Sequence, residues 1–223
     1  MISILPDVLD APTLAQLRGM LAEASFVDGK ATAGRRAQRV KRNEMLEPNS
    51  PTAGEARKLI MGALASNKNF ARITLPRRAQ PPMINRYAPG MEYGMHVDNA
   101  LMGKRPAVRS DISLTIFITD PADYDGGELT IEADYGQSKV KLPGGHVVVY
   151  PSSTLHRVEP ITRGTRIVAV SWIESYVRDP AKRQILYDIE RSSRKLEEFA
   201  PHSLESELAF KSYANLMRMW AET

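Results

Sequence analysis

The stretch "GGHVVVYPSSTLHRVEPITRGTRIVAVSWI" (residues 144–173) decides the fold. It contains three short runs rich in β-branched and aromatic residues, "HVVVYP", "LHRVEP" and "TRIVAVSWI", with Gly, Pro and small polar residues between them. Runs of this length and composition, separated by turn residues, are typical of β-strands. Because no helical pattern lies between them, we expect strands that follow one another directly, not alternating strands and helices.

The same pattern of short β-rich runs separated by turn residues extends over the middle of the chain. Further short runs bounded by Gly, Pro and Asp are "ARITLP" (71–76), "MINRYAP" (83–89), "EYGMHVD" (92–98), "DISLTIFITD" (111–120), "GELTIEA" (127–133) and "SKVKL" (138–142). Eight or nine short strands without intervening helices indicate a β-sandwich or barrel of the jelly-roll type. The sequence therefore predicts a jelly-roll core.

Helices are predicted on both sides of this core. Asp10 is a typical N-cap, and Leu14, Leu17 and Leu21 follow at helical spacing. A second helix is predicted from the cap Ser50, with Leu59, Ile60 and Leu64 facing inward. The overall expectation is an α+β chain with N-terminal helices packed on the core.

The C-terminal part returns to a helical pattern. Asp179 and Pro180 form a start signal, Ile185, Leu186 and Ile189 mark a buried face, and a last helix starts near Ser203 and carries Leu208, Leu216 and Met219. We expect two units: a jelly-roll domain with its N-terminal helices over 1–177 and a small helical subdomain over 178–223. The helices could lean on the core or form a homo-oligomer contact.

Composition excludes several kinds of chemistry. The 223 residues include no cysteine, so disulfides, thiolate metal sites and cysteine nucleophiles are excluded, and any metal must be bound by His, Asp or Glu. The N-terminus reaches Asp7 and Asp10 before any long apolar run, and no run approaches the about 20 apolar residues of a membrane span. We expect a cytoplasmic protein that does not contact the membrane.

Positive charge is concentrated in one segment. The net charge is only +4, but "GRRAQRVKRN" (34–43) contains five cations, Arg35, Arg36, Arg39, Lys41 and Arg42. No aromatic residue interleaves them, as stacking on nucleic-acid bases requires. The segment is therefore interpreted as a solvated face or the rim of an active site, and a nucleic-acid partner is not favoured.

The triplet His96-Val97-Asp98 is a candidate metal-binding motif. On an extended strand His96 and Asp98 project from the same face, while Val97 points to the other. Alone the motif is weak, because an ordinary hydrogen-bonded histidine is the commoner explanation. His156, on a later strand, changes this, since two imidazoles and one carboxylate on one face of an octahedron leave three adjacent positions for a bidentate cosubstrate and O2. A zinc hydrolase could use the same ligands.

Arg166 lies ten residues after His156. It heads the otherwise apolar strand "TRIVAVSWI", where a guanidinium needs an anionic ligand or must reach the surface. An arginine fork can bind a carboxylate through two parallel hydrogen bonds and stays charged in a dry site. Asp111 and Glu128 are candidates to orient a ligating imidazole, although residues of this kind often only end strands.

The order of these residues resembles the Fe(II)/2-oxoglutarate-dependent dioxygenases. The sequence around these residues is similar to the sequences of the bacterial PKHD-type hydroxylases, which are relatives of the prolyl 4-hydroxylases. The resemblance covers nearly the whole chain and includes "NRYAPGMEYGMHVDNALM", "DISLTIFITDPADYDGGELTI" and "DPAKRQILYDIERSSRKL". Each fragment alone is weak evidence, but the set is specific.

The resemblance implies a role for each candidate residue. His96, Asp98 and His156 would bind Fe(II), Arg166 would bind the distal carboxylate of 2-oxoglutarate, and Tyr87 would donate its hydroxyl to the same cosubstrate or pack as a strand aromatic. O2 would be the second cosubstrate and ascorbate the reductant. The products would be succinate, CO2 and a hydroxylated substrate. Since Asp98 is present, no metal position is vacant for chloride, and hydroxylation is favoured over halogenation.

Other functions remain open at this point. A non-catalytic module that senses iron or 2-oxoglutarate would use the same residues. An AlkB-like nucleic-acid demethylase is disfavoured, because members of that group resemble one another in a second Arg six residues after the first, and this sequence has Trp172 at that position. The substrate is a protein side chain, an amino acid or another small molecule, since fold does not choose among them. Lys104, Arg105 and Arg109 are predicted in a lid loop, where they would favour an acidic substrate or only solvate the loop.

Overall fold

Two antiparallel sheets face each other in the computed structural model, which describes residues 2–32, 38–103, 106–133 and 136–223. The larger sheet has the order β1-β14-β10-β17-β6-β4-β2, with β5 also paired to β17, and the smaller has the order β13-β12-β15-β7-β3. The larger sheet comprises β1 (Ser3–Leu5), β2 (Phe26–Asp28), β4 (Glu44–Leu46), β5 (Pro76–Ala79), β6 (Met83–Tyr87), β10 (Ile112–Phe117), β14 (Val147–Pro151) and β17 (Arg166–Ser175). The smaller sheet comprises β3 (Lys41–Arg42), β7 (Glu92–His96), β12 (Leu129–Ala133), β13 (Gly136–Val140) and β15 (His156–Val158).

The order of the strands is that of a jelly roll. In the larger sheet β6, β17, β10 and β14 are neighbours, and in the smaller sheet β7, β15, β12 and β13 are neighbours, so the chain crosses repeatedly from one sheet to the other. Two short two-stranded sheets lie off these sheets: β8 (Leu101–Met102) with β9 (Val108–Arg109), and β11 (Tyr124–Gly126) with β16 (Ile161–Gly164). The predicted α+β jelly-roll class is confirmed.

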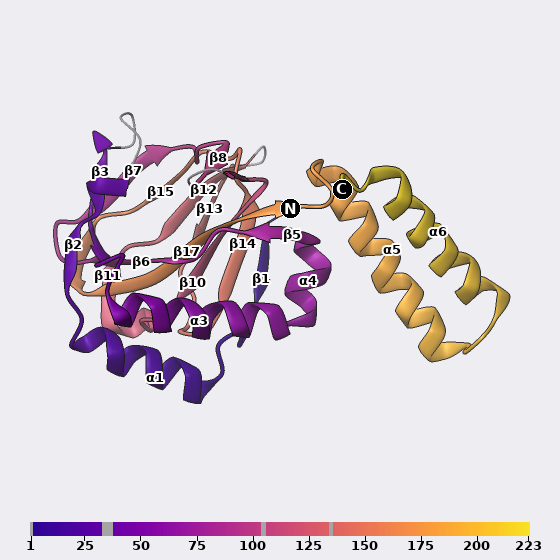
Figure 1. Ribbon diagram of the computed structural model, residues 1–223, viewed down its shortest axis with the longest axis horizontal. Coiled ribbons are helices and arrows are strands. Elements are labelled where there is room, and N and C mark those ends of the chain that lie inside the picture. Colours follow the sequence, from indigo (N-terminus) through magenta and orange to yellow (C-terminus); the bar gives the residue numbers. More distant parts are fainter. Residues whose placement is uncertain (1, 33–37, 104–105, 134–135) are drawn as a thin grey trace.

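Two N-terminal helices cover the outer face of the larger sheet (Figure 1). α1 (Ala11–Ala22) begins where the Asp10 carboxylate accepts a hydrogen bond from the Thr13 N–H, and α3 (Pro51–Ser66) begins at the cap Ser50. Their buried side chains Leu17 and Ile60 belong to one apolar cluster with strand residues of the larger sheet. A second apolar cluster lies between the two sheets.

The segment "ARITLP" was predicted as a strand, and this prediction was wrong. Residues of this segment form the end of the helix α4 (Lys68–Thr74), which begins at Asn67, whose side-chain oxygen accepts from the Phe70 N–H at 2.8 Å. Phe70 and Ile73 are buried on one face of this helix, so the segment has a helical pattern once the residues before it are included. Leu75, at φ +44°, ends the helix.

The C-terminal helices form a hairpin that projects from the sheets (Figure 1). α5 (Pro180–Phe199) and α6 (Leu204–Trp220) pack on each other, and an ion pair of 3.1 Å joins Arg72 on α4 to Glu190 on α5. Leu186 is buried as predicted, but Ile185 is 44% exposed because the hairpin contacts the core along only part of α5. Division of the chain at residues 177 and 178 stays a prediction.

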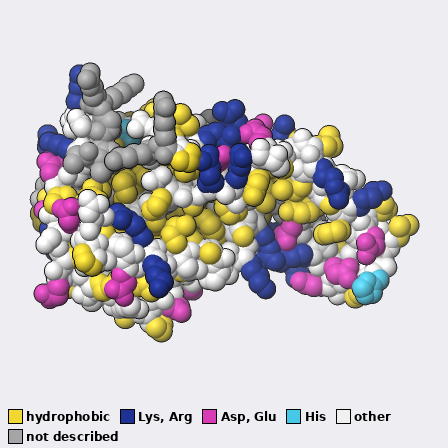
Figure 2. Space-filling model, in the orientation of Figure 1, with side chains coloured by type: hydrophobic (Ala, Val, Ile, Leu, Met, Phe, Trp, Pro, Cys, Tyr) yellow, Lys and Arg dark blue, Asp and Glu magenta, His cyan; other side chains and the backbone are white. Residues whose placement is uncertain are grey.

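Charged side chains gather where this hairpin joins the sheets, and hydrophobic side chains lie on its surface (Figure 2). At the junction Arg109 binds Asp111 at 2.8 Å and Glu222 at 2.7 Å. Among the helices in the described ranges, none has the length and apolarity needed to cross a bilayer. Formation of a homo-oligomer stays a prediction.

Candidate active site

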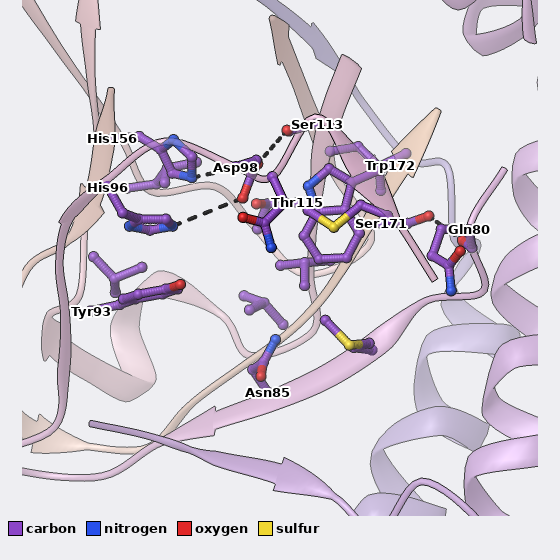
Figure 3. A pocket seen from close by; sticks show the side chains of 18 of the residues that line it. Gln80, Asn85, Tyr93, His96, Asp98, Ser113, Thr115, His156, Ser171 and Trp172 are labelled. Carbon is purple, nitrogen blue, oxygen red and sulfur yellow. Dashed lines mark hydrogen bonds and ion pairs between the residues drawn. The ribbon is translucent and has the colours of Figure 1, made fainter. Parts of the chain in front are cut away.

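A cavity of about 590 Å³ lies between the two sheets (Figure 3). It is lined by all five residues that the sequence analysis selected, which are His96, Asp98, His156, Arg166 and Tyr87. His96 and His156 come from the smaller sheet, and Arg166 and Tyr87 from the larger one. The fold therefore brings the predicted metal ligands and the predicted cosubstrate residues into one cavity.

The three predicted ligands converge on one point. β7 pairs with β15 in a register that places His96 opposite His156, and the two ring centres are 4.2 Å apart. Asp98 lies between them, with its two oxygens 4.0 Å from His96 Nε2 and 3.8 Å from His156 Nε2. One ligand atom from each residue lies within 4.8 Å of the others, which is the spacing of a site for a single metal ion.

Backbone carbonyls fix the orientation of both imidazoles. Nδ1 of His96 lies 2.8 Å from the Gly94 carbonyl oxygen, and Nδ1 of His156 lies 2.9 Å from that of Thr154. Since a carbonyl only accepts, each Nδ1 carries the hydrogen and each Nε2 presents its lone pair toward Asp98. Burial, reinforced by the nearby His156, lowers the pKa of His96 to about 4, so His96 is neutral near pH 7.

Asp98 is held by a serine that the sequence analysis missed. The alternation argument placed Asp98 on the same strand as His96. In the structure β7 ends at His96, so Asp98 lies just beyond the strand. The Ser113 hydroxyl on β10 donates to Asp98 Oδ2 at 2.5 Å and lies 2.7 Å from the Ser152 hydroxyl. Asp111, which was a candidate for this supporting role, instead accepts hydrogen bonds from Arg109 and from the Ser175 N–H.

Arg166 is a buried cation with no ion-pair partner among the described residues. Only 1% of its surface is exposed, and its guanidinium carbon lies 5.2 Å from the Tyr87 ring centre and 5.6 Å from that of Phe117. Among the described residues no group accepts a hydrogen bond from Nε, Nη1 or Nη2. An unpaired buried charge is costly, so the donors of Arg166 fit an anionic ligand in the cavity.

Two neighbours shape the surroundings of Arg166. Tyr87 is its cross-strand partner on β6, and burial raises the Tyr87 pKa to about 12, so its hydroxyl keeps its proton and can donate. Gly127, at φ +67°, lies beside the Arg166 side chain. A Cβ there would lie 2.9 Å from Arg166 Cδ and 2.3 Å from Ile161 Cδ1, so glycine leaves the room that the arginine side chain occupies.

The cationic side chains that were predicted outside the site differ in their positions and partners. Lys41 is buried and lines the cavity, so the interpretation of its segment as an active-site rim holds at this residue. Arg109 lies on β9 and is paired to Asp111, so it does not solvate a loop. The predictions for Arg35, Arg36, Lys104 and Arg105 fall outside the described residues.

A jelly roll whose inner cavity holds two imidazoles, a carboxylate and an unpaired guanidinium has the features of a mononuclear iron oxygenase with an anionic cosubstrate. Residues 82–174 match the family model of the 2OG-Fe(II) oxygenase superfamily. The chain is 44% identical to a PKHD-type hydroxylase of Xanthomonas campestris, over 98% of each chain, and 44% identical to one of Synechococcus elongatus, over all of both chains. The chain belongs to the PKHD-type hydroxylases of this superfamily.

Solved structures show the same fold at low sequence identity. A prolyl-4-hydroxylase of Pseudomonas putida aligns with a TM-score of 0.54 at 18% identity, over 78% of this chain and 92% of that one. A prolyl hydroxylase of Trichoplax adhaerens, in complex with a hypoxia inducible factor peptide fragment, aligns with a TM-score of 0.59 at 15% identity, over 83% and 86%. These structures show the fold alone; it is by its membership of the family that the chain is an oxygenase enzyme, and the family implies Fe(II) and 2-oxoglutarate.

Proposed function

We propose that the protein hydroxylates an unactivated C–H bond of a protein side chain, an amino acid or a small metabolite. In this proposal His96, Asp98 and His156 hold Fe(II), and Arg166 and Tyr87 bind 2-oxoglutarate. With these groups bound, the iron supplies the oxidising chemistry, in which 2-oxoglutarate becomes succinate and CO2 and one oxygen atom of O2 enters the C–H bond. Ascorbate as reductant and action in the cytoplasm stay predictions.

One observation carries the proposal: the buried, unpartnered guanidinium of Arg166 lines the same cavity as the three metal-ligand candidates. A zinc hydrolase needs the triad but not this guanidinium, whereas a cosubstrate with two carboxylates needs both. The fork can hold a carboxylate bidentately, and Tyr87 can add a neutral donor from the neighbouring strand.

The chain itself contributes binding, orientation and exclusion of water. The carbonyls of Gly94 and Thr154 keep both Nε2 atoms as acceptors for a metal, and Ser113 keeps one Asp98 oxygen fixed while the other remains available. The aromatic rings of Tyr87 and Phe117 enclose the Arg166 guanidinium, which keeps water from its donors. A carboxylate bound there replaces water in a site of low dielectric, where charge-assisted hydrogen bonds are strong.

Calorimetric titration of 2-oxoglutarate into the Mn(II)-loaded protein tests this proposal. We expect Arg166→Met to weaken binding at least about 30-fold, because a buried charge pair loses one partner. Arg163→Met is the matched control, since Arg163 is 59% exposed and pairs with Asp125 outside the cavity. Equal affinity in the native protein and Arg166→Met would refute the assignment of Arg166.

A further inference from the structure

The cavity contains a second buried cation, Lys41, on the sheet opposite Arg166. Lys41 lies on the edge strand β3, where it pairs with Tyr93 of β7, and it is 5% exposed. Its Nζ lies 5.4 Å from the Tyr93 ring centre, and Tyr93 is stacked on His96 with ring centres 3.6 Å apart. Lys41 is therefore connected through one ring to the metal-ligand candidates.

Lys41 has no ion-pair partner among the residues that the structure describes. Asp98 and Asp28 act on it only through their charge at longer range, and burial lowers the pKa of Lys41 to about 8. An ammonium held in a cavity without a carboxylate beside it costs folding free energy. A ligand that brings an anionic group to this wall of the cavity would remove that cost.

The two cations serve different parts of the cavity. Arg166 packs against Tyr87 and Phe117, at the start of β17 in the larger sheet. Lys41 packs against Tyr93 in the smaller sheet, on the side of His96. One small dicarboxylate that is bound to Arg166 and to a metal at the triad has both of its carboxylates assigned, so Lys41 is left for another molecule.

Asn85 adds a neutral donor to the same cavity. Its side-chain oxygen accepts a hydrogen bond from Asn43 Nδ2 at 3.0 Å, and Asn43 is the residue that joins β3 to β4. With that oxygen engaged, the Asn85 amide NH2 points into the cavity (Figure 3). The Tyr93 hydroxyl also points into the cavity.

Another part of the cavity combines apolar side chains with the polar side chains of Gln80 and Ser171 (Figure 3). Leu101 and Met102 of β8 and Trp172 of β17 line the cavity, and Leu101 is 65% exposed. A cavity of about 590 Å³ is large enough for the cosubstrate and part of a second molecule. A substrate with an apolar part and one anionic group would fit these apolar side chains and Lys41.

We propose that the substrate carries a carboxylate, that Lys41 binds this carboxylate with support from Asn85, and that its apolar part lies against Leu101, Met102 and Trp172. This inference rests on the proposed function, because it assigns the substrate of that same site. Lys41 is then a specificity-determining residue: it selects the substrate and takes no part in binding Fe(II) or 2-oxoglutarate.

A pair of probes of equal shape tests the inference. Benzoate and its neutral counterpart benzamide are titrated into the Mn(II)-loaded protein at saturating 2-oxoglutarate, and paramagnetic broadening of their proton resonances reports binding near the metal. We expect benzoate to bind the native protein, Lys41→Met and Lys41→Gln to weaken it about tenfold, and Lys41→Arg to restore it. Benzamide should bind weakly and equally to all of them. Lys139→Met, at an exposed lysine of β13, is the matched control.

Each other outcome overturns the inference in a distinguishable way. Benzoate that binds the native protein and both neutral variants equally, or no better than benzamide, shows that Lys41 does not select an anion. Benzoate that binds only by displacing 2-oxoglutarate shows that Arg166 is its site. If calorimetry finds that 2-oxoglutarate does not bind the native Mn(II) protein, the proposed function fails and this inference fails with it. Normal 2-oxoglutarate binding with benzoate binding insensitive to Lys41 overturns this inference alone.

Discussion

His96 and His156 are cross-strand partners on β7 and β15, with ring centres 4.2 Å apart and both Nδ1 atoms bound to backbone carbonyls. The register of two strands that are distant in sequence therefore sets the geometry of the candidate metal site. A shift of one residue in this register would turn one imidazole to the other face of the sheet. The site thus depends on the packing of the whole smaller sheet.

Ser113→Ala should weaken metal binding without unfolding the protein. The Ser113 hydroxyl is the donor that fixes Asp98 Oδ2, and loss of a residue that orients a ligand typically lowers metal affinity about 10- to 100-fold. Mn(II) affinity, measured by calorimetry, checks this, and Ser153→Ala is the control because Ser153 is exposed. Unchanged affinity in Ser113→Ala would show that Asp98 is held without this hydrogen bond.

Gly127→Ala should weaken 2-oxoglutarate binding although residue 127 contacts no ligand candidate of the triad. The added Cβ would lie 2.3 Å from Ile161 Cδ1 and 2.9 Å from Arg166 Cδ, and the φ of +67° is unfavourable for alanine, so both side chains and the backbone of residue 127 must shift. Calorimetry should show weaker 2-oxoglutarate binding, with Mn(II) affinity nearly unchanged. Gly136→Ala is the control, since its φ is also positive but nothing lies near its Cβ. An equal effect of both substitutions would contradict the packing argument.

The sequence predicted the central strands and the residues on them better than the residues that surround the candidate site. The strands that carry the candidate site are β-rich and bounded by turn residues, so local pattern sufficed to locate His96, His156 and Arg166. Ser113 could not be selected, because a serine inside an apolar strand has no local signal and acquires its role only when β10 faces Asp98. Lys41 was one of five clustered cations, and only the pairing of β3 with β7 distinguishes it.

Short segments were harder to predict. β3 and β4 have two and three residues, too few to show an alternating pattern, and exist because longer strands beside them offer hydrogen bonds. The error at "ARITLP" arose from its β-branched residues, which tertiary packing placed on the buried face of α4. Along α5 the apolar pattern predicted burial of Ile185, but the described part of the chain leaves this side chain 44% exposed.

Lys41→Met should stabilise the metal-free protein at neutral pH. The pKa of Lys41 is lowered from 10.5 to about 8 in the folded state, so between these values the unfolded chain binds more protons and native stability rises with pH. Below pH 8 the native protein bears the full cost of the charge, at most about 3 kcal/mol. Urea unfolding should therefore show an advantage of Lys41→Met at pH 7 that shrinks between pH 8 and 10.5. A pH-independent difference would contradict the buried-cation argument.

Glu174→Gln should destabilise the protein by about 1–3 kcal/mol, because Glu174 is 2% exposed and accepts from the Arg77 and Arg78 guanidinium groups. Burial alone would raise its pKa, but the Arg109 N–H and Arg78 hold the pKa of Glu174 below the usual value of 4.5. This contribution is complete above pH 4.5 and is lost as the pH falls through the lower folded pKa. Thermal unfolding at pH 7 and pH 3 checks it, with the exposed Glu205→Gln as control. An equal loss for Glu174→Gln at both pH values would contradict the charge argument.

The most direct test of iron-dependent turnover at this site is succinate formation from 2-oxoglutarate, under air with added Fe(II) and ascorbate. We expect slow turnover by the native protein without substrate, loss of turnover in His96→Ala, a much higher 2-oxoglutarate requirement in Arg166→Met, and native behaviour in Arg163→Met. Turnover in His96→Ala equal to that of the native protein, or an unchanged 2-oxoglutarate requirement in Arg166→Met, would contradict this expectation.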